Sequence, residues 1–84
     1  MLKILYRKKA LKGLKKMPAE VCAGFLEGFR RLADGKSRGL DVRPLTGRDG
    51  YRLRIREWRA IYEIRNDQLI ILVLDAGPRG GIYR

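Results

Sequence analysis

The sequence predicts an α+β domain in which two N-terminal helices pack on one face of a small, mainly antiparallel four-stranded sheet. Three observations predict this class. A short apolar segment with strand character opens the chain at residues 2–6. Two segments with apolar residues at helical spacing follow, at about 7–17 and 18–33. Three segments typical of strands then come at about 51–56, 58–65 and 68–76, which gives the order β-α-α-β-β-β.

The two helical segments differ in composition. The first is rich in lysine and has Ala10, Leu11, Leu14 and Met17 at helical spacing. A glycine at position 13 should weaken this helix by about 1 kcal/mol relative to alanine. Pro18 suits the first turn of the second helix, and Asp34-Gly35 is a typical end for it. The apolar stripe of the second helix consists of Val21, Cys22, Phe25, Phe29 and Leu32.

The second half of the chain predicts how the sheet is assembled. Residues 35–50 are rich in Gly, Pro and Arg, and we expect a connection without a strand. Asn66-Asp67 predicts a two-residue hairpin loop between the last two strands. The run Leu69–Leu74 is apolar on both faces, so the last strand should lie inside the sheet, next to the first strand. Both helices then cover one face of the sheet and leave the other open.

The charge balance points to an anionic partner. The chain has 84 residues, which fits a single domain (1–84), and a net charge of +11. A field of this size favours a polyanion: nucleic acid first, an acidic protein second and an anionic membrane third. A basic protein that is merely soluble is the alternative.

The missing residue types exclude several kinds of chemistry. The chain has no histidine, which removes the commonest general base and zinc ligand and every Ser-His or Cys-His pair. A lone cysteine, Cys22, excludes an internal disulfide and favours a reducing compartment. No apolar run approaches the roughly 20 residues that span a bilayer. We expect a soluble, cytoplasmic protein with no signal peptide, no membrane partner, no metal and no cofactor.

Alternating arginines give the strongest indication of function. In the segment 51–56, Arg52, Arg54 and Arg56 alternate with Leu53 and Ile55, so a strand would hold three guanidinium groups on the face opposite the core. Guanidinium groups fork around phosphate, and such a row is costly without an anionic partner. The C-terminal tail adds Arg79, Tyr83 and Arg84. We interpret these residues as a phosphate-binding face for RNA; a solvated charged face is the alternative.

Four stretches of the sequence resemble one known family. They are "KKALKGLKKMP", "PLTGRDGYRLRIREWRAIYEI" (44–64), "LIILVLDAG" and the tail "GPRGGIYR" (77–84), and together they span nearly the whole chain. They resemble the RelE/ParE toxin superfamily of type II toxin–antitoxin systems, on the RelE-like side. The resemblance implies a RelE-like microbial RNase-type fold and a ribosome-dependent mRNA endonuclease (an mRNA interferase) that inhibits translation.

The resemblance also implies site residues and partners. It maps two basic strand positions onto Arg52 and Arg54, a next-strand arginine onto Arg59, and a tail arginine and tyrosine onto Arg79 and Tyr83. Arg59, Arg79 and Tyr83 are then the candidate catalytic residues, and Arg52, Arg54, Arg56 and Arg84 the candidate RNA-binding residues. The implied partners are mRNA, ribosomal RNA at the A site, and a cognate antitoxin in a hetero-oligomer.

The chemistry leaves the general base open. Where some members of the family have lysine, this chain has Arg52 and Arg54, and arginine stays protonated in proteins. Tyr83 and Glu57 remain as candidates. Each residue also has a structural alternative: Arg59 could pair with Glu57 or Glu63, Arg79 could be merely exposed, and Tyr83 could be a packing residue.

Three functions remain open on this reading. The first is the ribosome-dependent endoribonuclease. The second is a ParE-like inhibitor of DNA gyrase, which would share the fold and need no RNA-cutting residues. The third is a catalytically degenerate member that survives as a basic RNA- or protein-binding module.

Overall fold

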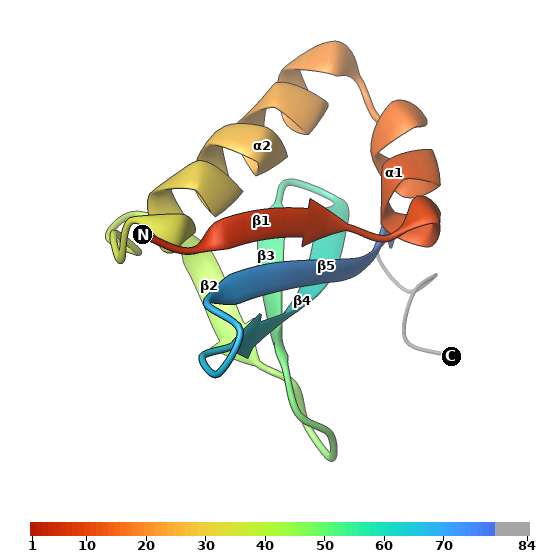
Figure 1. Cartoon of the computed structure of the whole chain (residues 1–84). Helices are drawn as coiled ribbons and strands as arrows, with labels where there is room; N and C mark the ends of the chain where they lie inside the picture. The colour runs from red at the N-terminus through yellow and green to blue at the C-terminus, as the bar shows by residue number, and fades with distance from the viewer. Residues whose placement is uncertain (79–84) are drawn as a thin grey trace.

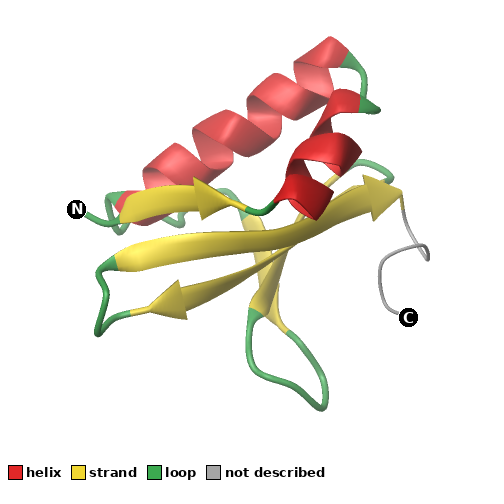
Figure 2. Cartoon of the chain, turned by 45° about the vertical axis from the view of Figure 1, so that its right-hand side comes forward, coloured by secondary structure: helices red, strands yellow, loops and turns green. Residues whose placement is uncertain are grey.

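The structure, a computed structural model, describes residues 1–78. Its elements are β1 (Lys3–Tyr6), α1 (Lys8–Lys15), α2 (Ala19–Ala33), β2 (Asp41–Pro44), β3 (Tyr51–Ile55), β4 (Trp58–Arg65) and β5 (Ile70–Pro78). The strands form one sheet in the order β1-β5-β4-β3-β2, in which only the β1–β5 pair is parallel (Figure 1). Both helices lie on the same side of this sheet (Figure 2). The predicted α+β class and the single helical layer are confirmed.

The sheet has a fifth strand that the sequence did not predict. Residues Asp41–Pro44 form β2 and pair antiparallel with β3 at the edge of the sheet. The composition of β2 is not typical of a strand, because its one apolar residue, Val42, lies between two charged residues and the segment ends in a proline. Val42 lies opposite Leu53 and packs on the core, while the proline is tolerated because an edge strand has one side free of ladder hydrogen bonds. The strand therefore depends on its pairing with β3 more than on its own propensity.

The last hairpin also differs from the prediction. Arg65 pairs with Ile70, so the β4–β5 loop has four residues, 66–69, and the predicted two-residue loop is wrong. Leu69 has a positive φ of 57° and is 63% exposed, so it belongs to the loop. The interior position of β5 is confirmed, because β5 lies between β1 and β4 and its residues Ile70–Val73 are buried.

Aromatic side chains connect α2 to the sheet. Phe25 and Phe29 of α2 are fully buried, as the apolar stripe predicted. The Phe29 ring meets the Tyr62 ring edge to face with 5.2 Å between centroids, and Tyr62 stacks on Tyr51 at 5.6 Å. Burying a side chain of this size contributes roughly 1.5–3 kcal/mol. Together with Leu53, Ile71 and Val73, these residues hold the middle of the sheet against α2.

The Tyr62 hydroxyl should make the fold sensitive to alkali. Burial, with a smaller contribution from Tyr51, raises the pKa of Tyr62 from 10.0 to about 12. Because the folded-state pKa is the higher one, its contribution to stability is full below pH 10 and is lost as the pH rises through about 12. We expect the melting temperature of the wild type to fall more steeply than that of Tyr62→Phe between pH 10 and 12. Parallel curves for the two proteins in thermal melts would contradict this.

Candidate nucleic-acid interface

Four arginines gather on the sheet face opposite the helices. Leu53 of β3 points at the helices and contacts Gly28 of α2, so its neighbours Arg52 and Arg54 lie on the other face. Residues directly opposite in a ladder share a face. The pairs Arg54–Arg59 and Arg43–Arg52 therefore complete a set that we call the arginine face, which consists of Arg43, Arg52, Arg54 and Arg59. The predicted position of Arg52 and Arg54 on the face opposite the core is confirmed, and the pairing of β3 with β4 adds Arg59 to them.

The arginine face has a cost for folding. Two cross-strand pairs within it, Arg43–Arg52 and Arg54–Arg59, place like charges directly opposite each other. Like charges directly opposite each other destabilise a sheet. A bound anion would reverse the sign of this energy. The arrangement therefore favours the binding of an anionic ligand.

Arg43 is a member of the arginine face that the sequence did not single out. It lies on β2, in the segment that the composition assigned to a connection. The alternation Asp41-Val42-Arg43, with the apolar residue inward, was the one signal that could have placed it. Arg43 and Arg52 also line a hollow of about 380 Å³ beside the β2–β3 loop, together with Pro44, Leu45 and Thr46.

Local contacts hold two of these guanidinium groups in place. Arg52 is only 11% exposed and its Nη1 lies 3.5 Å from Asp41 Oδ1, which is close enough for ionic attraction, yet this nitrogen makes no hydrogen bond. The Arg54 Nε donates a hydrogen bond to the Arg56 carbonyl oxygen at 3.0 Å. These contacts orient both side chains, and since a guanidinium has five N–H donors, Arg54 keeps further donors for a ligand, whereas Arg52 is largely buried.

Arg56 does not continue the row, and its predicted place on this face is wrong. It follows the end of β3 in the tight β3–β4 turn, with a positive φ of 55°. Its Nη1 donates to Glu20 Oε1 of α2 at 2.9 Å. The strict alternation inferred from the sequence fails here because Ile55 already pairs with Trp58, so the strand ends one residue before Arg56.

The remaining candidates fall into two groups. Arg79, Tyr83 and Arg84 lie outside the residues that the structure describes. Gly77 is the cross-strand partner of Arg59, and Arg79 comes two positions after Gly77 in the sequence. Among the alternatives, Glu63 accepts hydrogen bonds from Arg65, at 2.9 Å in the closer contact, and Glu57 is an exposed residue of the β3–β4 turn.

Two aromatic residues of β4 contribute to the core. Tyr62 is 1% exposed, and Trp58 packs against the core. Within residues 1–78, no cluster of three His, Cys, Asp or Glu side chains could hold a metal ion. No helix in this same part of the chain is long and apolar enough to cross a membrane.

The fold is similar to that of solved toxin structures. The archaeal RelE of the RelE–RelB complex from Pyrococcus horikoshii OT3 is 29% identical, with a TM-score of 0.75 over 95% of this chain and 97% of that one. A metal-bound toxin from Helicobacter pylori is 18% identical, with a TM-score of 0.81 over 99% and 100%. The isolated E. coli RelE toxin is 17% identical, with a TM-score of 0.78 over 99% of this chain and 89% of that one.

Two further comparisons bear on the family. No curated protein matches the chain significantly. The family model described as the ParE toxin of type II toxin–antitoxin system, parDE, matches residues 4–83. Since this match covers nearly the whole sequence, and the solved structures agree with it in fold, the chain belongs to the RelE/ParE superfamily and is a toxin of a type II toxin–antitoxin system.

Proposed function

We propose that this toxin is a ribosome-dependent mRNA endonuclease of the RelE kind. The observation that carries the proposal is the arginine face, on which cations of β2, β3 and β4 are held together against their mutual repulsion. The 29% identity to the archaeal RelE of the Pyrococcus complex supports the same branch of the superfamily. Messenger RNA in the ribosomal A site is the proposed substrate.

The arginine face suits the charge that develops during RNA cleavage. The 2′-hydroxyl attacks the adjacent phosphorus, the phosphorane gains negative charge, and the 5′-oxygen leaves with a proton. Fixed cations beside the phosphate supply electrostatic stabilisation, which is usually the largest single contribution. In this proposal Arg59 stabilises the reacting phosphate together with Arg79, while Arg52, Arg54 and Arg43 bind the flanking phosphates.

The proton transfers need groups other than arginine. Arginine stays protonated at any pH at which proteins are folded, so the arginine face cannot supply a base. Tyr62 is also excluded, because it lies in the core on the helix side of the sheet and its pKa is raised to about 12. We propose Tyr83 as the proton-transferring residue, with Glu57 as the alternative.

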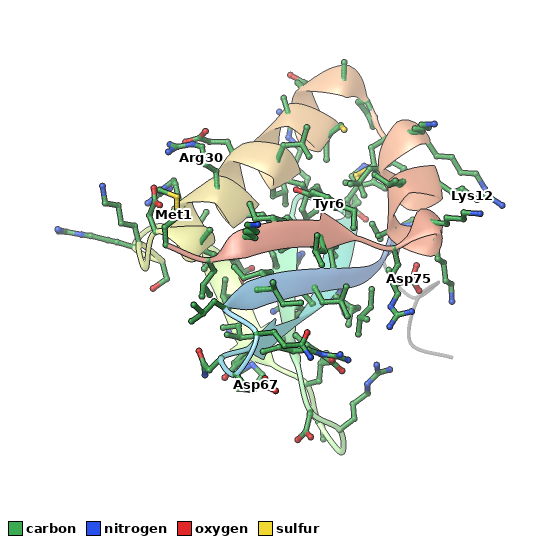
Figure 3. The ribbon with its side chains drawn as sticks, viewed as in Figure 1. Met1, Tyr6, Lys12, Arg30, Asp67 and Asp75 are labelled. Atoms are coloured by element: carbon green, nitrogen blue, oxygen red, sulfur yellow. The ribbon has the colours of Figure 1, made fainter. Side chains whose placement is uncertain are left out.

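The experiment that tests this function is primer extension on mRNA from translating extracts. The wild type should cut mRNA on programmed ribosomes and leave the same naked RNA intact. Arg79→Ala and Tyr83→Phe should lose cutting, while Arg30→Gln should keep it. Arg30 suits the control because it lies on the outer side of α2, in ion pairs with Glu27 and Asp34 (Figure 3). Intact mRNA with the wild type would refute the proposal.

Inhibition of DNA gyrase is the second candidate function. It is favoured by one observation, the description of the matching family model as a ParE toxin. A supercoiling assay with purified gyrase separates the two functions. Inhibited supercoiling together with intact mRNA would support the ParE-like function, and cut mRNA with unaffected supercoiling would support the RelE-like one.

We also propose a cognate antitoxin that forms a hetero-oligomer with this toxin. The net charge of +11 calls for a partner with an acidic segment, and the exposed Leu5, Leu11 and Leu26 offer apolar contacts to an amphipathic one. The RelE toxins of Pyrococcus horikoshii and Methanococcus jannaschii were solved as complexes with RelB. Co-purification with the product of the neighbouring gene tests this, and a toxin that stays free in that experiment would contradict it.

Removing the Asp41 carboxylate, which lies beside the arginine face, should strengthen the affinity of that face for RNA. Asp41 lies on this face, and it pairs with Arg52 at 3.5 Å. We expect Asp41→Asn to raise the affinity for single-stranded RNA roughly threefold, the effect of deleting one negative charge about 6 Å from a phosphate in water. Fluorescence anisotropy at low and high salt measures it. An affinity that falls, or a gain that does not shrink at high salt, would contradict the assigned role of Asp41.

A further inference from the structure

A second cationic site lies on the helix side of the sheet, where β4 begins and β5 ends. The end of β5 and the side of α1 enclose a groove of about 510 Å³, lined among others by Lys9, Lys12, Lys16, Trp58, Asp75 and Pro78. Lys9 and Lys12 belong to α1 and Lys16 is its C-cap residue, so the three lysines come from one side of the helix, since positions three and four apart are neighbours. Figure 3 shows Lys12 projecting from α1 and Asp75 at the base of the same helix.

The charge of this groove is unbalanced. Lys9 lies 3.2 Å from Asp75, whose carboxylate also accepts a hydrogen bond from the Ala76 backbone N–H at 2.8 Å. Asp75 is thus neutralised and fixed. Lys12 and Lys16 form no salt bridge within residues 1–78. The ammonium groups of Lys12 and Lys16 therefore line the groove without a counter-charge. The one carboxylate among the described lining residues, Asp75, is already paired with Lys9.

The groove also offers an aromatic surface. Trp58 is half-buried: it packs against the core and also lines the groove, as does Pro78. Unpaired lysines beside a tryptophan are the two elements by which proteins bind single-stranded nucleic acid: cations follow the phosphates and a ring stacks on a base. An acidic protein segment would use the cations and would leave the flat aromatic surface without a planar partner.

The position of the groove connects it with the arginine face. Trp58 directly precedes Arg59 in β4, and successive residues of a strand point to opposite faces of the sheet. The groove and the arginine face thus flank the same end of β4, one on each side. A single RNA strand that passes this end of the sheet could contact both.

We propose that the groove formed by Lys12, Lys16 and Trp58 binds one nucleotide of single-stranded RNA, with its base on Trp58 and its flanking phosphates on the two lysines. This inference rests on the proposed RNA-directed function and extends it to α1. It assigns to the lysine-rich helix a specific binding role, which its overall charge alone does not define.

The test uses Trp58 as its own probe, since the chain has a single tryptophan. A single-stranded RNA of about ten nucleotides, within the site sizes of such proteins, is titrated into the full-length toxin. We expect the tryptophan fluorescence to be quenched on binding. Lys12→Gln/Lys16→Gln should weaken binding roughly 25-fold at 0.1 M salt and reduce the slope of log K against log salt by about 1.4, the value for two lost phosphate contacts.

The matched control is Lys8→Gln/Lys15→Gln. This pair removes the same charge from the same helix at exposed positions outside the groove lining, and should leave both affinity and quenching close to the wild-type values. Equal losses in the two double variants, or binding without any change of tryptophan fluorescence, would overturn the proposal. Loss of antitoxin binding with unchanged RNA binding in Lys12→Gln/Lys16→Gln would also overturn it and identify the groove as a protein site.

The groove and the nuclease function fail in different experiments. A toxin that shows the expected quenching and lysine dependence but leaves mRNA intact on programmed ribosomes would refute the nuclease and support the groove. A toxin that cuts mRNA while the two double variants bind the RNA equally would refute the groove alone.

Discussion

Replacing Arg59 with glutamine is expected to lower the rate of mRNA cleavage on programmed ribosomes by about 100-fold or more, since one lost electrostatic contact to a transition state has an effect of that order. Arg59 lies opposite Arg54 and beside Gly77, at the junction of the arginine face with the segment that leads to Arg79. Glutamine keeps most of the side-chain length and two N–H donors but removes the charge. The loss should therefore appear in kcat, because the charge matters most when the phosphorane forms.

Arg54→Gln is the informative partner of this variant. Arg54 is proposed to bind a flanking phosphate, which carries the same charge in the ground state and in the transition state. Loss of the Arg54 charge should raise KM more than it lowers kcat. The difference in KM between variant and wild type should shrink at high salt, because salt also weakens RNA binding by the wild type. Single-turnover cleavage measured at several salt concentrations separates the two variants. A wild-type kcat in Arg59→Gln would remove Arg59 from the catalytic group.

The sequence predicted those parts of the fold that depend on strong local patterns. The stripe on α2 has helical periodicity, β3 has a period of two, and β5 is a continuous apolar run. All three patterns appear in the structure. β2 has no such pattern, because its stability comes from pairing with β3. The four-residue β4–β5 loop was missed for a related reason: Leu69 is apolar, yet it occupies the loop with a positive φ.

Some residues of the candidate site could be placed from the sequence, and others could be placed only from the structure. Alternation along one strand is enough to place Arg52 and Arg54 on one face, and the antiparallel hairpin brings Arg59 to them. Arg43 could not be placed before β2 was known, and Arg56 could not be excluded before the position of the turn was known. The α1 groove depends on how closely α1 approaches β5, which is set by tertiary packing and leaves only a faint trace in the sequence, the glycine at position 13.

Replacing Gly13 with alanine is expected to destabilise the protein, although helix propensity alone predicts a gain of about 1 kcal/mol. A Cβ at position 13 would lie 1.8 Å from the Ala76 carbonyl oxygen and 2.6 Å from its carbonyl carbon. Both are backbone atoms of β5, so no rotamer change can relieve the contact, and α1 must move away from the sheet. Ala10 and Leu14, which are buried on either side of Gly13, would lose packing with it.

Gly24→Ala is the matched control, since both glycines lie inside helices. A Cβ at position 24 would meet only the Ile55 Cδ1 atom, at 3.1 Å, and this is the end of a flexible side chain. Thermal melts should show Gly24→Ala near or above the wild-type melting temperature and Gly13→Ala lower by roughly 15 °C, which corresponds to a loss of about 3 kcal/mol in a domain of this size. A raised melting temperature for Gly13→Ala would mean that α1 does not lie directly on the β5 backbone. The groove between them would then have a different shape from the one described.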